Sequence, residues 1–306
     1  MHGYKNMRFR LYKRCGSGKE RTNMKKTQTR KKWIGYLLTC TALISVTSTA
    51  HAEATISVPE TGFITHSRTL SPLSSIYNDT TYYQQANGKA GKDLKQALHH
   101  IIDHHTELSY DAVWDALRNT DEDPTNPNNI LLLYTGRSQG KFTNGANTGQ
   151  WNREHVWAKS HGNFGTEKGA GTDLHHLKPA DVTVNSARGN LDFDEGGTTH
   201  PLATNCKYTT TTWEPSNQVK GDIARMLFYM AVRYEGDHGE IDLELNDTVN
   251  RGQAPYMGKL ATLLKWHEQD PVDAFETRRN DMIYSKYQHN RNPFIDHPEW
   301  VQAIWK

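Results

Sequence analysis

Cysteine is nearly absent from this chain. Only three of its 306 residues are cysteine, and two of them, Cys15 and Cys40, precede residue 53. Without that segment Cys206 has no cysteine to pair with, which excludes an internal disulfide, and we predict no disulfide-linked partner. The fold must then be stabilised by its hydrophobic core, and a chain of roughly 250 residues is long enough to form one.

Long apolar runs and an excess of one charge are also missing. No stretch reaches the ~18 apolar residues of a membrane-spanning helix, so we expect no contact with a membrane after export. The composition is 35% hydrophobic and 23% charged, which is ordinary for a globular domain. It excludes collagen-like, coiled-coil and wholly disordered proteins.

The N-terminus carries the pattern of an export signal. Basic residues follow Met24, an apolar segment runs over residues 33–46, and a small-residue site ends at Ala52. Met24 is a candidate start, because a signal of ordinary length would then end at Ala52. We expect residues 1–52 to be removed by cleavage near Ala52 and residues 53–306 to be secreted or periplasmic; the alternative is a stable N-terminal anchor.

Export changes the charge of the protein. Residues 1–52 hold 12 of the 36 basic residues and one of the 34 acidic residues, so the remaining chain has a net charge of −9. Between Arg137 and Arg188, however, seven basic residues face four acidic ones. A local basic patch of this kind can attract an anionic ligand, although the same counts can arise on an ordinary solvated surface.

Hydrophobic spacing predicts a single α+β domain, mostly helical around a small central sheet. After an N-terminal arm at 53–80, the predicted helices cover residues 91–105, 110–118, 219–234, 257–267, 271–288 and 298–305. Predicted strands cover 130–134, 151–157 and 173–178. A short helix is expected to start at Pro179 and to end before Gly189.

Four histidines in the first of these helices occur as adjacent pairs at the edges of its apolar face. Because the pairs border an amphipathic helix, a solvated or supporting role is the better prediction than a metal site. They are His99, His100, His104 and His105.

The most informative residues lie between 150 and 190. In the predicted short helix, Asn185 shares a face with Asp181 and Arg188. Asparagine has poor helix propensity, so its place in the middle of a helix needs a reason. Asn185 therefore either bonds a neighbouring loop or has a ligand outside the helix. Glu154 and His155 are consecutive, so they can serve one site only if their strand ends or bulges near residue 154.

A carboxylate, an amide oxygen and a nearby imidazole suit one hard cation such as Mg²⁺. They do not suit structural zinc, which takes cysteine or several histidines. Mg²⁺, a neutral histidine and basic surroundings together favour phosphodiester hydrolysis, because histidine can take a proton from water near neutral pH and the metal can neutralise the leaving oxygen.

Three motifs carry a family resemblance. They are Trp151-Asn152-Arg153-Glu154-His155-Val156-Trp157, Asp173-Leu174-His175-His176-Leu177-Lys178-Pro179-Ala180 and Val184-Asn185-Ser186-Ala187-Arg188-Gly189-Asn190. With segments 220–230 and 290–294, they resemble the endonuclease I family of secreted and periplasmic nucleases, particularly its extracellular ribonuclease branch. This family belongs to the His-Me finger, or ββα-metal, superfamily. The resemblance covers roughly residues 75–305 and implies a ββα-metal core at about 150–190.

The resemblance implies roles for individual residues. His155 would be the general base, and Glu154 and Asn185 would bind Mg²⁺, with Mn²⁺ or Ca²⁺ as possible substitutes. Products would carry 5′-phosphate and 3′-hydroxyl ends. Arg188 and Arg225 are candidates for the arginine that stabilises the transition state, with an intramolecular salt bridge as the alternative for both. Gly171 departs from members that have a carboxylate there. We assign substrate binding to Arg153, Lys159, His175, His176 and Lys178.

Two other functions compete with this interpretation. One is a zinc-dependent hydrolase using some of the histidines, although no ligand motif supports it. The other is a non-catalytic secreted module that binds polysaccharide or nucleic acid, with Trp151 and Trp157 as a stacking face. No segment resembles a sequence reader, so we predict a monomeric endonuclease of low sequence specificity. The choice between DNA and RNA stays open, because it depends on a contact with the 2′-hydroxyl.

Overall fold

The computed structural model describes residues 77–306, which lie within one compact unit, Ser67–Lys306. The predicted signal segment and nearly all of the predicted N-terminal arm lie outside the described residues. The helices are α1 (Asp79–Tyr82), η2 (Gln84–Ala86), α2 (Gly91–Ile102), α3 (Ala112–Thr120), α4 (Val182–Arg188), α5 (Lys220–Arg233), η3 (Asp237–Gly239), α6 (Leu260–Gln269), α7 (Ala274–Lys286), α8 (Pro293–Asp296) and α9 (Glu299–Trp305).

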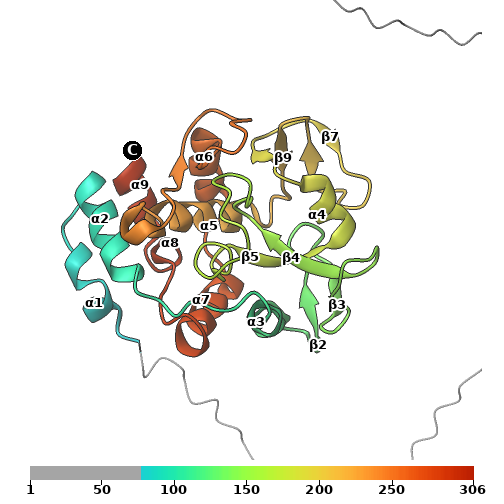
Figure 1. Ribbon diagram of the computed structural model, residues 1–306, viewed down its shortest axis with the longest axis horizontal. Coiled ribbons are helices and arrows are strands. Elements are labelled where there is room, and N and C mark those ends of the chain that lie inside the picture. The colour runs from blue at the N-terminus through green and yellow to red at the C-terminus, as the bar shows by residue number, and fades with distance from the viewer. Residues whose placement is uncertain (1–76) are drawn as a thin grey trace, which may run out of the picture. The chain divides into compact units, whose positions relative to one another are not determined.

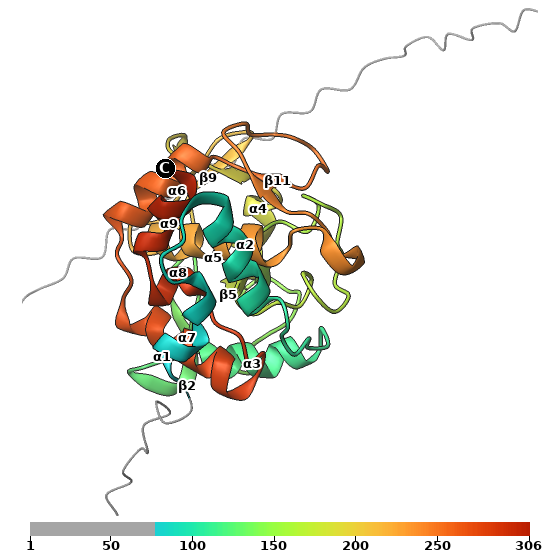
Figure 2. The same ribbon diagram turned by 90° about the vertical axis from the view of Figure 1, so that its left-hand side faces the viewer.

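The helical part is built around α5. Every residue of α5 is buried, and its neighbours include α2, α6 and α8. Figure 1 shows α5 in the middle of the described unit, with α2 and α9 on one side and the strands β4 and β5 on the other. Figure 2 shows α2 in front of α5. The helix predicted over 219–234 is confirmed, and burial on all sides explains why its sequence is apolar beyond one stripe.

The strands do not form one central sheet. They are β1 (Glu122–Asp123), β2 (Asn126–Leu131), β3 (Ser138–Gly140), β4 (Trp151–His155), β5 (Leu177–Asp181), β6 (Asp192–Phe193), β7 (Thr198–Thr199), β8 (Lys207–Tyr208), β9 (Thr212–Glu214), β10 (Glu244–Leu245) and β11 (Tyr256–Met257). Within residues 77–306 they form four small sheets, in the orders β1-β2-β3, β4-β5, β6-β9-β8-β7 and β10-β11. Mixed α and β structure is therefore confirmed, whereas the predicted single small sheet is replaced by several.

The antiparallel pair β4–β5 is followed directly by α4. The register runs from Trp151 opposite Asp181 to His155 opposite Leu177. Pro179 lies inside β5, so the prediction that it ends the strand and starts the helix is wrong. A two-stranded sheet tolerates proline because one edge of each strand is unpaired. The helix begins instead after Asp181, whose side chain caps the amides of Thr183 and Val184.

Other predicted boundaries move by a few residues. The apolar segment 130–134 is only partly strand, because β2 ends at Leu131 and Leu132–Tyr134 continue as a buried turn. The remaining predicted helices are present, with ends that differ from the prediction by up to three residues. Cys206 is buried and free, and its thiol donates to the carbonyl oxygen of Tyr134. Across residues 77–306, no helix has the length and apolar character needed to cross a bilayer.

Candidate active site

His155 is the last residue of β4 and is only 6% exposed. Its Nε2 lies 3.0 Å from the carbonyl oxygen of Gly171. A carbonyl oxygen only accepts hydrogen bonds, so Nε2 must donate and the lone pair of the neutral ring is on Nδ1. Burial, reinforced by the neighbouring His176, holds the pKa of His155 well below its usual value. The ring is therefore neutral near pH 7, as a general base must be.

The loop 162–171 supplies the carbonyl that orients His155. At Gly171 a β-carbon would lie 2.8 Å from the backbone oxygens of Glu167 and Gly165, so no side chain fits without moving the loop. This tight turn brings the Gly171 carbonyl to the histidine. It also explains in steric terms why a carboxylate is missing at this position.

Glu154 lies beside His155 in β4 and is 2% exposed. Its Oε1 accepts hydrogen bonds from the Tyr134 hydroxyl at 2.6 Å and from Arg188 Nη1 at 3.1 Å. Burial raises the pKa of Glu154, and the charge of Arg188 opposes that rise. Among the described residues nothing donates to Oε2, so this oxygen is available to a ligand.

Arg188 is the fully buried last residue of α4. Besides Glu154, it donates to the carbonyl oxygens of His155 at 2.8 Å and Val156 at 2.6 Å. Its guanidinium also lies over the Phe193 ring, 4.7 Å from the ring centroid. Arg188 therefore fixes the end of β4 and the Glu154 carboxylate, and burial keeps it from a substrate phosphate.

Asn185 projects from α4 towards β4. Its Nδ2 donates to Asn152 Oδ1 at 2.8 Å and lies 3.5 Å from the carbonyl oxygen of Arg153. The side-chain oxygen Oδ1 accepts no hydrogen bond from the described residues. Asn152 and Glu154 are two residues apart in β4, so their side chains share one face of the strand. A free amide oxygen and a free carboxylate oxygen on this face are suitable donors for a hard cation, so the donor set fits the expected Mg²⁺.

Aromatic residues complete the surroundings of β4. The Arg153 guanidinium lies 3.3 Å from the Tyr110 ring centroid and 4.0 Å from that of Trp114. The ring centroids of Tyr110 and His155 are 5.9 Å apart. Sequence reasoning missed Tyr110 and Tyr134, because no motif marks either residue and both come from segments that precede β4.

Four residues predicted to act on substrate lie in the interior. His175 contacts Asn290 and the Tyr229 ring, and burial lowers its pKa to about 4. His176 is equally buried; its Nε2 donates to the carbonyl oxygen of Ala170, and its pKa is also about 4. Both rings are therefore neutral parts of the core, and neither has surface for a substrate.

Lys178 and Arg225 are buried in ion pairs. Lys178 pairs with Asp121, which also binds Arg279. Arg225 donates from two nitrogens to the carboxylate of Glu276 in α7. Its partners come from α5 to α7 rather than from β4, β5 or α4, so the structure supports the intramolecular salt bridge that was the alternative for this residue.

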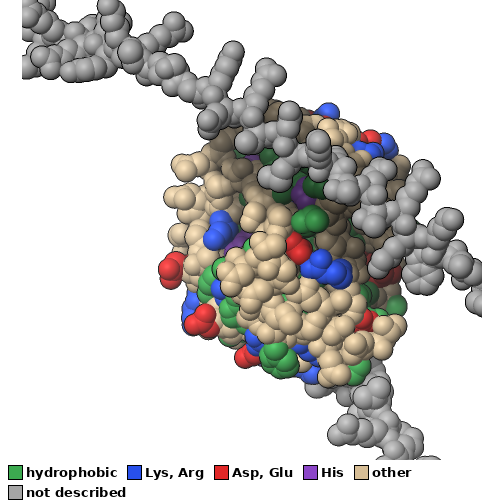
Figure 3. Space-filling view, turned by 90° about the vertical axis from the view of Figure 1, so that its right-hand side faces the viewer, with side chains coloured by type: hydrophobic (Ala, Val, Ile, Leu, Met, Phe, Trp, Pro, Cys, Tyr) green, Lys and Arg blue, Asp and Glu red, His purple; other side chains and the backbone are tan. Residues whose placement is uncertain are grey.

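The basic window from Arg137 to Arg188 is mostly neutralised. Four of its seven basic residues are paired with carboxylates: Arg137 with Asp181, Lys141 with Glu122, Lys178 with Asp121, and Arg188 with Glu154. Figure 3 shows lysine and arginine side chains scattered over the uncovered surface rather than gathered in one patch. Within residues 77–306, Lys159 and Lys168 are the members of the window that have neither an ion pair nor an aromatic stack.

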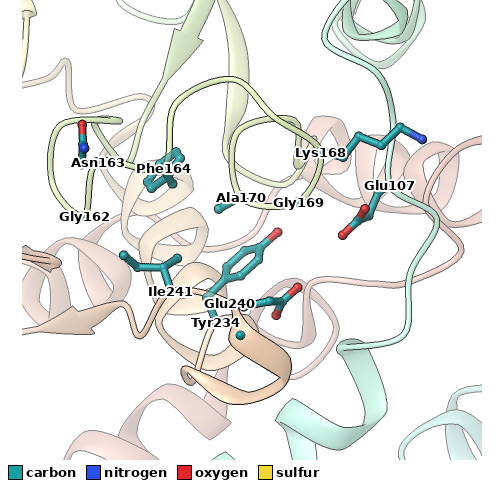
Figure 4. Close-up of a pocket in the computed structure, with 11 residues that line it drawn as sticks. Glu107, Gly162, Asn163, Phe164, Lys168, Gly169, Ala170, Tyr234, Glu240 and Ile241 are labelled. Carbon is teal, nitrogen blue, oxygen red and sulfur yellow. The ribbon is translucent and has the colours of Figure 1, made fainter.

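A pocket of about 450 Å³ lies against the loop that orients His155. Figure 4 shows Phe164 and Lys168 of this loop on one side and Tyr234, Glu240 and Ile241 on the other. The Phe164 ring centroid is 6.5 Å from that of His155. The pocket is therefore next to the proposed base, and Lys168 brings a positive charge to its rim.

Comparison with known proteins identifies the family. The endonuclease I family model matches residues 90–299. The chain belongs to the endonuclease I family. It is 66% identical over 225 residues to an extracellular ribonuclease of Bacillus amyloliquefaciens, covering 74% of this chain and 78% of the relative. It is 58% identical over 287 residues to an extracellular ribonuclease of Bacillus subtilis (strain 168), covering 90% and 99%.

Membership confirms the resemblance drawn from the three motifs, including its extracellular ribonuclease branch. The endonuclease I chain described here is therefore a nuclease, an enzyme that hydrolyses phosphodiester bonds. The matched range contains β4, β5 and α4, so the buried pair Glu154–Arg188 and the oriented His155 lie inside the family region.

Proposed function

We propose that the protein is a secreted, sequence-nonspecific, Mg²⁺-dependent endonuclease in which His155 is the general base. The observation that carries this proposal is the hydrogen bond from His155 Nε2 to the Gly171 carbonyl oxygen, which leaves Nδ1 as the proton acceptor. The buried ring is neutral, and Glu154 precedes it in the same strand. This arrangement suits removal of a proton from an attacking water.

The metal would be held by Glu154 Oε2 and Asn185 Oδ1. When bound, Mg²⁺ would polarise the scissile phosphate and neutralise the charge that develops on the leaving 3′ oxygen. Arg188 and Tyr134 hold the other oxygen of Glu154, which orients the carboxylate. His155 takes the proton at Nδ1, and the Gly171 carbonyl stabilises the resulting imidazolium through Nε2. The products would carry 5′-phosphate and 3′-hydroxyl ends.

Substrate contacts would come from few residues. Lys159, which contributes to the lowered pKa of His155, and Lys168 are placed to contact backbone phosphates. We propose RNA as a substrate, because both relatives are extracellular ribonucleases, and DNA as a second one, because no residue of the site is arranged to read a sugar or a base. The names of the relatives also support secretion.

Cleavage of matched single-stranded RNA, single-stranded DNA and duplex DNA tests this function. We expect RNA cleavage with added Mg²⁺, no cleavage in EDTA, and recovery when excess Mg²⁺ is restored. Labelled ends should show 5′-phosphates at cuts without a preferred sequence. Cleavage that persists in EDTA, or products with cyclic or 3′-phosphate ends, would contradict the proposed chemistry.

The affinity for RNA should fall with salt concentration less steeply than the seven basic residues between Arg137 and Arg188 suggest. In EDTA, where no cleavage occurs, the affinity for single-stranded RNA should fall with salt as expected for a few released counterions. Lys159→Ala should reduce the slope of log affinity against log salt by about 0.7. Lys141→Ala is the matched control, because Lys141 is already neutralised by Glu122. Equal slopes for the two variants would remove Lys159 from the binding surface.

A further inference from the structure

A second cluster of ionisable side chains lies where the end of α2 meets η3. His99 Nε2 is 2.9 Å from Asp237 Oδ2 and 4.0 Å from Asp103 Oδ2. His238 Nε2 is 3.5 Å from the same Asp237 oxygen. The candidate ligand atoms of Asp103, Asp237 and His238 all lie within 4.8 Å of one another. Two helical segments far apart in the sequence thus bring nitrogen and oxygen donors to one point.

Each carboxylate in this cluster has one buried oxygen without a hydrogen bond. Asp103 is only 8% exposed, yet its Oδ1 is buried without a hydrogen bond. Asp237 Oδ1 is also buried without one. A buried carboxylate oxygen without a donor is costly, whereas a bound cation would satisfy it. Asp103 Oδ1 has only the imidazole of His104 nearby, at 3.5 Å, so the two free carboxylate oxygens point to a positively charged ligand.

His99 is oriented as metal-binding histidines are. Its Nδ1 lies 2.9 Å from the carbonyl oxygen of Val232, which can only accept, so Nδ1 donates. In the neutral ring the Nε2 lone pair is then directed at the Asp237 carboxylate, 2.9 Å away. Two lone pairs at this distance require a proton or a metal ion between them. A backbone carbonyl that fixes the ring in this way is a common support for a metal ligand.

We propose that His99, Asp103, Asp237 and His238 form a structural zinc site, distinct from the catalytic Mg²⁺ site. Two imidazoles and two carboxylates suit Zn²⁺, whereas Mg²⁺ and Ca²⁺ prefer oxygen alone. Tetrahedral ligands about 2.0 Å from zinc lie about 3.3 Å apart. The distances of 2.9, 3.5 and 4.0 Å between these ligand atoms lie on either side of that value, so small side-chain movements would complete the site.

The zinc would tie α2 to the wall of the pocket beside the active site. Gly239 and Glu240, which end and follow η3, line that pocket. The opposite wall is the loop that holds His155. Zinc would therefore stabilise the pocket without taking part in hydrolysis. The histidines in and after α2 therefore have different roles in this proposal. His99 is a ligand, while His104, which follows the helix, is exposed to solvent.

Zinc binding to the EDTA-treated and dialysed protein tests this site. Calorimetry is run in excess Mg²⁺, which occupies the proposed catalytic site, and Co²⁺ is added separately as a spectroscopic probe. We expect one zinc ion per chain, a higher melting temperature with zinc, and the intense visible absorption of tetrahedral Co²⁺. Asp103→Asn and His99→Gln should each weaken zinc binding by about tenfold or more. His289→Asn is the matched control, because His289 is exposed and bonds the carbonyl oxygen of Tyr284 in α7, and it should bind zinc as wild type.

The isosteric variant separates loss of the site from loss of the fold. Without zinc, Asp103→Asn should melt at or above the temperature of the wild type, because it removes a buried charge that has only the imidazoles of His99 and His104 near it. With zinc, its melting temperature should not rise. Zinc affinity in Asp103→Asn equal to that of wild type, or no zinc binding by the wild type, would overturn the proposal. Neither result depends on nuclease activity, so the proposed function is tested separately.

Discussion

His155→Ala should reduce kcat for RNA cleavage by roughly 10²- to 10⁴-fold, the usual contribution of a general base. In the proposed mechanism the imidazole takes the proton from water, and the hydrogen bond to the Gly171 carbonyl leaves Nδ1 as its acceptor. The affinity for RNA in EDTA should change little, because the ring is nearly buried. Initial rates at saturating RNA with Mg²⁺, beside binding in EDTA, measure the two effects.

His104→Ala is the matched control for this variant. It removes an exposed histidine that follows α2 and lies against Asp103 rather than against β4, and it should leave kcat unchanged. Added imidazole should restore part of the activity of His155→Ala and none in the control. If His155→Ala keeps a tenth or more of the wild-type kcat, another group must be the base.

Arg188→Met should destabilise the protein by about 3 to 5 kcal/mol, the usual effect of removing one partner of a buried ion pair. The substitution leaves the Glu154 carboxylate buried without its counter-charge. It also takes the donor from the carbonyl oxygens of His155 and Val156 at the end of β4. Urea unfolding followed by tryptophan fluorescence gives the change in free energy of unfolding.

A second substitution tests the origin of that loss. In Glu154→Gln/Arg188→Met no uncompensated charge remains, so part of the stability should return. Arg137→Met is the control and should cost under about 1 kcal/mol, because Arg137 is half-exposed and its buried partner Asp181 keeps two hydrogen bonds from backbone amides. A loss in Arg188→Met no larger than in Arg137→Met would mean that the buried pair does not hold the strand.

Local patterns were enough to predict the longer helices and the order strand, strand, helix around the site. The apolar spacing of 219–234 predicted α5. The glycine-containing loops that separate β4 from β5 and end α4 indicated that β4 and β5 are separate strands and where α4 ends. The start of α4 was missed because Pro179 was given its usual role in the first turn of a helix. Pairing with Arg153 keeps Pro179 extended instead, and Asp181 then caps the helix.

Burial inside the motifs could not be predicted. Lys178 stands next to motif residues, but its partner Asp121 comes from the turn after α3. The partner of His175, Asn290, lies near the C-terminus. Such contacts depend on how distant segments pack, which periodicity and spacing do not report. The same limit applies to Tyr134, whose bond to Glu154 joins a buried turn to β4.

The main-chain bond between Gly171 and His155 has an evolutionary consequence. Many catalytic histidines are oriented by a carboxylate side chain, which one point mutation can remove. Here the orienting atom is a carbonyl oxygen that every amino acid carries, so a substitution at residue 171 removes the bond only by displacing the loop. What selection must preserve is the path of the backbone through loop 162–171, where only glycine fits at Gly171. Exposed positions of the loop, such as Glu167, are then free to vary while the base keeps its tautomer.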